Sequence, residues 1–186
     1  MRPQPSGERL KTSVFIATSM DGFIARSDGA LDWLMAATPV DGDHGYDAFM
    51  ASIDVIVMGR NTFETVLGFE DWPYDGKRVV ILSRSLDEVP HSLAGKVQLH
   101  RGPANALYES LARAGCQGLY VDGGQTVQSF LREDLVDELT ITRIPVLLGD
   151  GIPLFGHLGH DITLRHLSTR SLAGGLVQSV YTTRQP

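Results

Sequence analysis

Four short, uninterrupted apolar runs constrain this fold more than any other feature of the sequence. Each run has three or four residues and is followed by polar or glycine residues. Runs of this length without polar alternation indicate strands that are covered on both faces, as in parallel sheets. The predicted strands are residues 14–17, 55–58, 79–82 and 119–121.

Helical patterns lie between these runs. Apolar residues spaced three and four apart predict one-sided helices, and Pro103 suits the first turn of one of them. Repeated strand–helix–strand units imply a mainly parallel sheet with helices on both faces. The apolar residues of the three helical stripes are Phe63, Val66 and Leu67, then Leu107 and Leu111, then Val127, Phe130 and Leu131.

The last third of the chain has a different pattern. Leu139 and Ile141 indicate one strand, and residues 162–164 and 176–182 indicate two more, with a tight turn at Ala173-Gly174-Gly175. Such close spacing favours antiparallel pairing. The predicted fold is therefore α/β, with a mainly parallel mixed sheet and an antiparallel C-terminal edge.

Size and composition restrict the function classes. The 186 residues are 42% hydrophobic, enough for one domain over residues 11–186 after a polar, flexible tail at residues 1–10. A net charge of −6 excludes an overall basic field, so no nucleic-acid partner is expected. No stretch reaches the roughly 18 apolar residues of a membrane span, and no signal peptide is visible. With Cys116 as its single cysteine, the chain is expected to be cytoplasmic.

Three motifs follow successive predicted strands at the edge where α/β sheets bind ligands. Two are glycine-led helix starts, whose free amides and positive dipole ends suit phosphates. Arg60 and Arg84 add charge for a further phosphate. The motifs are Gly59-Arg60-Asn61-Thr62, Ser83-Arg84, and Gly123-Gly124-Gln125-Thr126, and together they predict a dinucleotide site.

Each motif also has a purely structural explanation. A Gly-Gly pair between strand and helix is often only a turn, and Arg84 could be a solvated loop charge. A GxGxxG signature and a P-loop are both missing. The acidic run of Asp134, Asp137 and Glu138 is most simply a solvated stretch, and His157 and His160 on a glycine-rich loop predict no metal site.

Six segments in order resemble the dihydrofolate-reductase-like superfamily. The similarity is strongest to the C-terminal reductase domain of the bifunctional riboflavin-biosynthesis deaminase–reductase, here in a stand-alone form without a cysteine-rich zinc motif. This resemblance implies a three-layer fold, NADPH as the cofactor and a homodimer. The segments are residues 19–25 (SMDGFIA), 31–34 (LDWL), 57–64 (VMGRNTFE), 82–84 (LSR), 121–124 (VDGG) and 144–155 (IPVLLGDGIPLF).

The resemblance assigns roles to the motifs. Residues 59–62 with Ser83 and Arg84 would hold the adenosine 2′-phosphate and the pyrophosphate, and residues 123–126 would cradle the pyrophosphate. Ala17 and Ile24 would flank the nicotinamide carboxamide with backbone groups. The two arginines exceed what a pyrophosphate needs, which favours NADPH over NADH.

A proton source is expected between residues 21 and 49. Asp32 and Asp47 are the predicted catalytic residues, and Trp33 and Phe49 are predicted to bind a flat heteroaromatic substrate. Asp43 and His44 also qualify by position. The alternatives are a helix-start role for Asp32, a solvated Asp47 and a core Trp33. The turn Gly149-Asp150-Gly151 either lines the site or closes a hairpin.

The sequence thus predicts an NADPH-dependent reductase of a small heterocyclic substrate, similar to 5-amino-6-(5-phosphoribosylamino)uracil reductase. The spacing from Asp47 to the Gly59-Arg60 motif departs from that of dihydrofolate reductases, and no full set of groups for a ribosyl phosphate is matched. Alternatives are a dihydrofolate or pteridine reductase, a non-catalytic NADP-binding module, and a structural dimer that binds no nucleotide.

Overall fold

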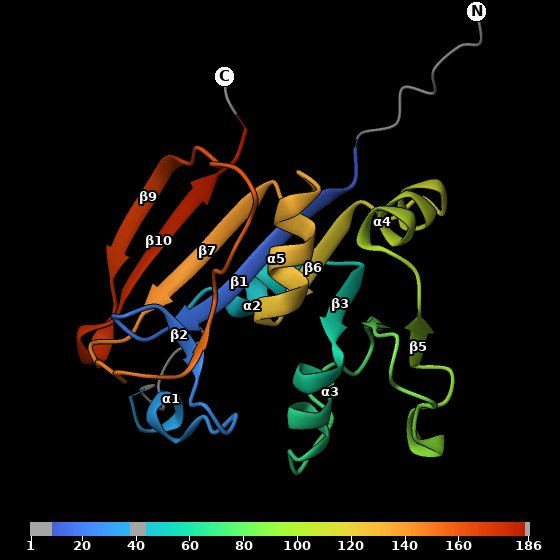
Figure 1. Cartoon of the computed structure of the whole chain (residues 1–186), viewed down its shortest axis with the longest axis horizontal. Coiled ribbons are helices and arrows are strands. Elements are labelled where there is room, and N and C mark those ends of the chain that lie inside the picture. The colour runs from blue at the N-terminus through green and yellow to red at the C-terminus, as the bar shows by residue number, and fades with distance from the viewer. Residues whose placement is uncertain (1–8, 38–43, 185–186) are drawn as a thin grey trace, which may run out of the picture.

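The computed structural model of the chain describes residues 9–37 and 44–184, which form a central eight-stranded sheet (Figure 1). The strand order is β5-β4-β3-β6-β1-β7-β10-β9, and a separate pair is made by β2 and β8. The strands are β1 (Lys11–Thr18), β2 (Phe23–Ala25), β3 (Val55–Gly59), β4 (Arg78–Leu82), β5 (Val97–His100), β6 (Gly118–Asp122), β7 (Glu138–Arg143), β8 (Ile152–Pro153), β9 (Arg165–Ser171) and β10 (Val177–Thr182).

The pairing confirms the predicted fold class. The strands from β5 to β7 in the sheet order are parallel to one another, while β10 is antiparallel to both β7 and β9. The strand predicted at residues 162–164 is wrong by a few residues, because the observed strand is β9. All seven residues of β9 are exposed, so burial imposes no apolar pattern on it. The expected homodimer stays a prediction.

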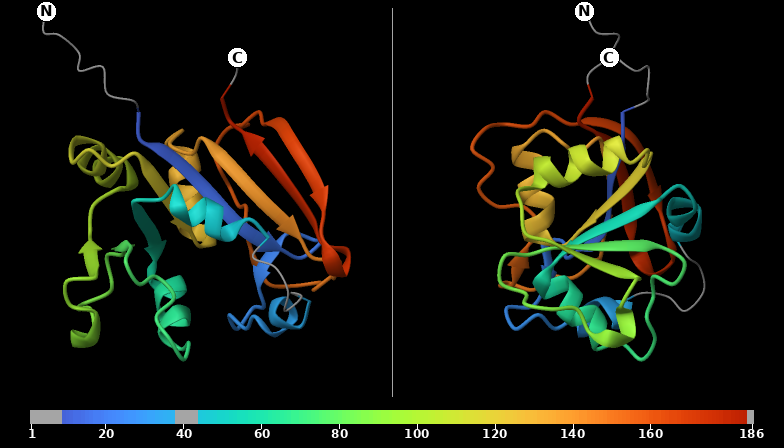
Figure 2. Two further views of the ribbon diagram at one scale, coloured as in Figure 1. Left: turned by 180° about the vertical axis from the view of Figure 1, so that it is seen from behind. Right: turned by 90° about the vertical axis from the view of Figure 1, so that its right-hand side faces the viewer.

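Helices cover both faces of the sheet, as a three-layer fold requires (Figure 2). One face packs against α4 and α5, and the other packs against α2 and α3. The helices are α1 (Asp32–Ala37), α2 (Tyr46–Ala51), α3 (Arg60–Leu67), α4 (Ala104–Arg113) and α5 (Gly124–Arg132), with short 3₁₀ turns at His91–Leu93 and Ala173–Gly175. None of the helices in the described ranges is long and apolar enough to cross a membrane.

The apolar run of β3 explains the two covered faces. Val55 and Val57 point into the core under α4 and α5, whereas Ile56 and Met58 point into the core under α2 and α3. All four side chains are buried. Because successive side chains of a strand point to opposite faces, a strand covered on both faces must be apolar throughout.

The central strand β1 changes its neighbours along its length. It pairs with β6 only from Lys11 to Ser13, but it pairs with β7 from Ser13 to Thr18. The carboxyl half of β1 therefore has no ladder partner on its β6 side. This separation opens the sheet at the carboxyl ends of its central strands, where α/β proteins bind ligands.

The last two residues of the predicted tail are part of the described structure, whereas residues 1–8 lie outside the described residues. Leu10 packs in the core with 1% of its surface exposed, and the Arg9 guanidinium donates a hydrogen bond to the Asp134 carbonyl at 3.2 Å. Leu10 therefore belongs to the folded domain.

Asp137 is not solvated, so the prediction of a fully exposed acidic run is wrong at this position. Its side chain is 9% exposed and accepts hydrogen bonds from the Thr12 amide at 2.9 Å and from the Arg184 guanidinium. Arg9 lies 3.6 Å from the same carboxylate. Asp137 therefore ties β1, the entry to β7 and the end of β10 together.

We expect Asp137→Ala to lower the free energy of unfolding by about 2 kcal/mol, because it leaves the Thr12 amide and the Arg184 guanidinium without their acceptor and removes the ion pair with Arg9. Solvent around the half-exposed arginines keeps the loss below that of a fully buried pair. Urea unfolding of wild type and variant measures this loss of free energy. The exposed neighbour Glu133→Ala is the control, expected within about 0.5 kcal/mol of wild type. Equal stability of the two variants would contradict this role.

Candidate functional site

A cavity of about 1320 Å³ lies at the carboxyl ends of β1, β3, β4 and β6. All twelve residues that the sequence assigned to a dinucleotide line it, although they come from five separate segments of the chain. Such convergence is expected for a binding site and not for independent turns. These residues are Ala17, Ile24, Gly59, Arg60, Asn61, Thr62, Ser83, Arg84, Gly123, Gly124, Gln125 and Thr126.

The starts of α3 and α5 face each other across the floor of this cavity. A Cβ atom on Gly59 would lie 2.8 Å from the Thr126 hydroxyl oxygen, and one on Gly123 would collide with the Thr62 hydroxyl. Gly123 also has a φ of +88°, which favours glycine. Neither helix has a side-chain cap or an acidic residue in its first turn. Their first-turn amides are therefore suited to bind an anion.

Two arginines stand beside these helix starts. Arg60 donates a hydrogen bond to Glu64 at 2.6 Å and lies 3.4 Å from the Ser85 hydroxyl. Arg84 is exposed on the loop after β4. The Ser83 hydroxyl accepts hydrogen bonds from the amides of two residues of this loop, Ser85 and Leu86. The loop that carries Arg84 is thus ordered, and both guanidinium groups can reach a phosphate in the cavity.

The backbone of β1 supplies polar groups at the other end of the cavity. The Tyr120 hydroxyl donates a hydrogen bond to the Phe15 carbonyl at 2.9 Å, so this carbonyl faces β6. Backbone groups two residues apart in a strand face the same side, which directs the Ala17 amide and carbonyl into the opening. Ile24 lies over the start of α5, with its Cδ1 atom 3.1 Å from the Cβ position of Gly124. A carboxamide fits between such groups.

The four residues predicted for catalysis and substrate binding do not line this cavity. Asp32 forms an ion pair with Arg26 at 2.7 Å, and the hydrogen bonds of this pair lower the pKa of Asp32. Asp47 is exposed on α2. Asp43 lies outside the described residues. Neither Asp32 nor Asp47 is among the residues that line the cavity, and their catalytic role stays a prediction.

The two aromatic predictions fail because both rings pack into the protein. Trp33 is 5% exposed and packs with Ile144 and Leu176. Phe49 lies behind the cavity wall, with its ring centroid 4.9 Å from that of Phe15 and 5.0 Å from that of Tyr120. The aromatic side chains that do line the cavity include Phe15, Tyr74 and Tyr120. Phe49 supports this wall from behind.

Asp122 is the acidic residue that sequence reasoning missed. It ends β6, lines the cavity, and accepts a hydrogen bond from the Gly123 amide at 2.8 Å. Burial raises the pKa of Asp122 to about 6, although the hydrogen bond from the Gly123 amide and the neighbouring Tyr120 side chain oppose the shift. The available signal was its position, since an acid directly at the carboxyl end of a central strand faces the ligand edge.

Tyrosine hydroxyls surround this carboxyl group. Burial, followed by the charge of Asp122, raises the pKa of Tyr74, Tyr120 and Tyr46, the last to about 12. All three hydroxyls therefore stay protonated at neutral pH. Asp122 is the group in this cluster whose charge changes near neutrality, which suits general acid chemistry.

The turn Gly149-Asp150-Gly151 does not line the cavity. Gly149 donates a hydrogen bond from its amide to Asp21 at 2.8 Å, and the Asp150 carboxylate accepts one from the Ser27 hydroxyl at 3.0 Å. The turn leads directly into β8, which pairs with β2, and Ile152 of β8 reaches the cavity. The structure supports neither alternative left open by the sequence, because the turn does not line the cavity and β8 pairs with β2 and not with β7, the strand before the turn.

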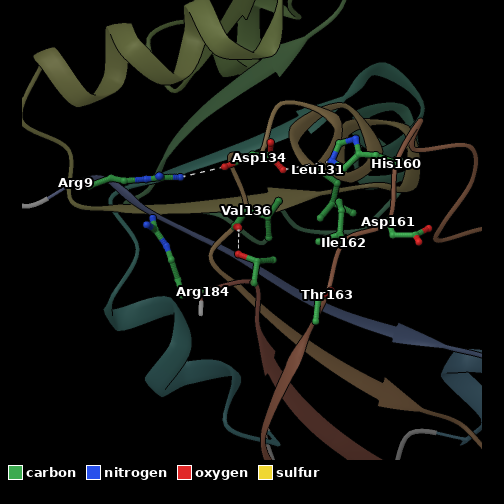
Figure 3. Close-up of a pocket in the computed structure, with 10 residues that line it drawn as sticks. Arg9, Leu131, Asp134, Val136, His160, Asp161, Ile162, Thr163 and Arg184 are labelled. Atoms are coloured by element: carbon green, nitrogen blue, oxygen red, sulfur yellow. Dashed lines mark hydrogen bonds and ion pairs between the residues drawn. The ribbon is translucent and has the colours of Figure 1, made fainter. Parts of the chain in front are cut away.

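A second cavity of about 580 Å³ lies near the amino ends of β1 and β7 (Figure 3). Arg9, Arg184 and His160 line it, but both arginines contact the buried Asp137 described above. His160 lies 3.5 Å from Asp134. These charges are balanced within the protein, and none of the predicted site residues is here.

A mixed α/β sheet with two glycine-led helix starts at its open carboxyl edge defines a reductase-like domain. Residues 11–178 match the family described as the RibD C-terminal domain, and the chain belongs to that family. The resemblance seen in the sequence is thereby confirmed.

Relatives with similar sequences support the same family assignment. The chain is 36% identical over 173 residues to the uncharacterized protein YwjB of Bacillus subtilis strain 168, covering 92% of this chain and 97% of YwjB. It is 28% identical to the riboflavin biosynthesis protein RibD of Corynebacterium ammoniagenes, covering 80% of this chain but 47% of RibD.

Solved structures give the same fold. A Shewanella sp. PV-4 protein assigned to riboflavin biosynthesis has a TM-score of 0.90 at 43% identity, covering 95% of this chain and all of that one (100%). The deaminase/5-amino-6-(5-phosphoribosylamino)uracil reductase of Thermotoga maritima has a TM-score of 0.69 at 12% identity, covering 94% of this chain and 56% of that one.

We expect Gly123→Ala to weaken NADPH binding at least about tenfold, because the new methyl group meets Thr62 where the two helix starts converge. Fluorescence titration measures the affinity. Gly115→Ala is a matched control, since Gly115 also has a positive φ, of +83°, but nothing lies within 4 Å of its Cβ position. Both variants should lose about 1 kcal/mol of stability. Loss of affinity in the control as well would show that backbone strain alone is responsible.

Proposed function

We propose that this protein is an NADPH-dependent reductase that acts on a small heterocyclic substrate. The observation that carries this proposal is the single cavity that joins two phosphate-ready helix starts and two arginines to Asp122. Membership of the RibD C-terminal domain family supports a reductase, and the chemistry of the lining residues supports the cofactor.

The lining residues fit NADPH from one end to the other. Arg60 and Arg84 would bind the 2′-phosphate, and the first-turn amides of α3 and α5 would bind the pyrophosphate. The backbone of Ala17 would orient the carboxamide of the nicotinamide. When bound, NADPH would supply a hydride for the reduction of a C=N or C=O bond.

Asp122 would hold the proton that accompanies the reduction. With a pKa of about 6, about a tenth of the molecules carry this proton at pH 7. The Gly123 amide holds the carboxyl group of Asp122, and the Tyr120 hydroxyl beside it donates to the Phe15 carbonyl at the opening between β1 and β6. A ring held against Phe15 would then present its reacting atom to Asp122.

The non-catalytic NADP-binding module remains the main alternative. It needs the helix starts and the arginines but has no use for an acid with a raised pKa. The position of Asp122 beside the place proposed for the nicotinamide favours the reductase. A dihydrofolate or pteridine reductase would use the same groups and differs only in its substrate.

We expect wild type to bind NADPH at least about tenfold more tightly than NADH, and Arg84→Ala to reduce this ratio about tenfold by weakening NADPH alone. Fluorescence titration with both nucleotides measures the ratio. Arg78→Ala is the control, because Arg78 begins the same strand at the opposite end and is hydrogen-bonded to Gln98. Equal binding of both nucleotides by wild type would exclude the assigned 2′-phosphate site.

We expect Asp122→Asn to lower kcat about 100-fold or more while NADPH affinity is kept, because the amide cannot donate the proton. Wild-type kcat should fall as the pH rises through about 6, and the variant should lose this dependence. The assay is NADPH oxidation with a substrate found among pyrimidines and pteridines. Asp47→Asn makes the same change outside the cavity and is the control.

Asp122→Asn should also change how the stability of the folded protein depends on pH. A carboxyl whose pKa is raised on folding binds its proton more tightly in the folded state, so wild type loses stability as the pH rises from about 4 to about 6. Asp122→Asn removes this loss. Thermal unfolding at both pH values tests the sign, and a variant that is less stable than wild type only at high pH would contradict the raised pKa.

A further inference from the structure

Positive charge is confined to one end of the large cavity. Among the described residues that line it, only Arg60 and Arg84 are cationic, and both stand at the start of α3 and the loop after β4. This is the end that the proposed cofactor occupies with its own phosphates. A phosphate on the substrate would need a cation at the other end.

The other end is acidic. Its wall includes the segment after β2, in which Asp28 lines the cavity and Ser27 donates its hydroxyl proton to Asp150. Arg26 directly precedes this segment in the sequence. It is held by Asp32 through two hydrogen bonds of 2.7 and 2.9 Å, and it does not line the cavity.

The remaining wall carries aromatic rings and a carboxyl group. Phe15, Tyr74 and Tyr120 line the cavity next to Asp122. A carboxylate accepts N–H groups and repels a phosphate, and the repulsion is strong where protein surrounds the charge.

We propose that the substrate carries no phosphate group and is a neutral or cationic heterocycle that presents ring or amino N–H groups to Asp122. This inference rests on the proposed function and names its substrate class. The proposed substrate class differs from that of the Thermotoga maritima protein, which is named as a reductase of a phosphoribosyl compound. Asp28 would act as a specificity residue by repelling phosphorylated analogues.

The test compares matched pairs of heterocycles, with and without a phosphate monoester, on the NADPH-saturated full-length protein. The pairs are 5-amino-6-ribosylaminouracil and a ribosylated pterin with their 5′-phosphates. Equilibrium binding and kcat/KM are both measured. We expect the unphosphorylated member to bind and react at least about tenfold better, with the ratio shrinking as salt is added.

The outcomes are distinct for the two proposals. Equal or better binding of the phosphorylated members would overturn the inference about the substrate. Preferential binding of the unphosphorylated members without NADPH oxidation would support the inference and overturn the reductase. Loss of NADPH binding itself would overturn both, because the acidic end is defined by where the cofactor lies.

A charge variant tests the assigned cause. Asp28→Asn keeps an oxygen acceptor for the Ala30 amide, which Asp28 binds at 3.0 Å, but removes the charge. We expect it to reduce discrimination against phosphorylated ligands about threefold, since Asp28 is exposed and screened by water. Glu109→Gln makes the equivalent change on the outer surface of α4 and is the control. Identical discrimination in both variants would show that Asp28 does not set the preference.

Discussion

The candidate functional site depends on the point at which β1 stops pairing with β6. The two strands are paired only as far as Ser13, while β1 continues beside β7 to Thr18. A fully paired β1 would satisfy its own backbone groups and close the sheet. Because β1 is unpaired on its β6 side, the Phe15 carbonyl accepts a hydrogen bond from the Tyr120 hydroxyl. The backbone groups of Ala17 remain available to a ligand. The early end of the pairing between β1 and β6 therefore opens the cavity and exposes part of its polar lining.

The parallel sheet then sets the charge of each end of the cavity. Helices that follow parallel strands begin at the same edge, so α3 and α5 bring their positive ends together. The glycines at these starts allow close approach, with Gly59 beside Thr126 and Gly123 beside Thr62. The segment after β2 belongs to no such helix and contributes the carboxylate of Asp28 instead. A cavity with a cationic and an acidic end follows from the topology and from one loop.

These relations also explain what the sequence could and could not predict. Apolar runs and glycine-led helix starts are local signals, so the central strands were predicted, and the twelve residues predicted to bind a dinucleotide all line one cavity. Phe49 and Trp33 looked available because a single sequence does not show which aromatic rings pack inward. Asp137 looked solvated because its partners, Thr12 and Arg184, lie more than a hundred and more than forty residues away in the chain. Asp122 was missed because its environment is made by β1 and by tyrosines from other segments.

Asp122 and Gly123 link the two halves of the proposed reaction. The Gly123 amide donates to the Asp122 carboxylate at 2.8 Å, and the next residue opens α5. The turn that would hold the pyrophosphate thus also fixes the carboxyl group that would supply the proton. The loop after β2 shares no residue with this turn and lines another part of the same cavity. Changes in that loop can therefore alter which substrate is accepted without moving the turn or Asp122. In this way one fold can serve substrates of different charge.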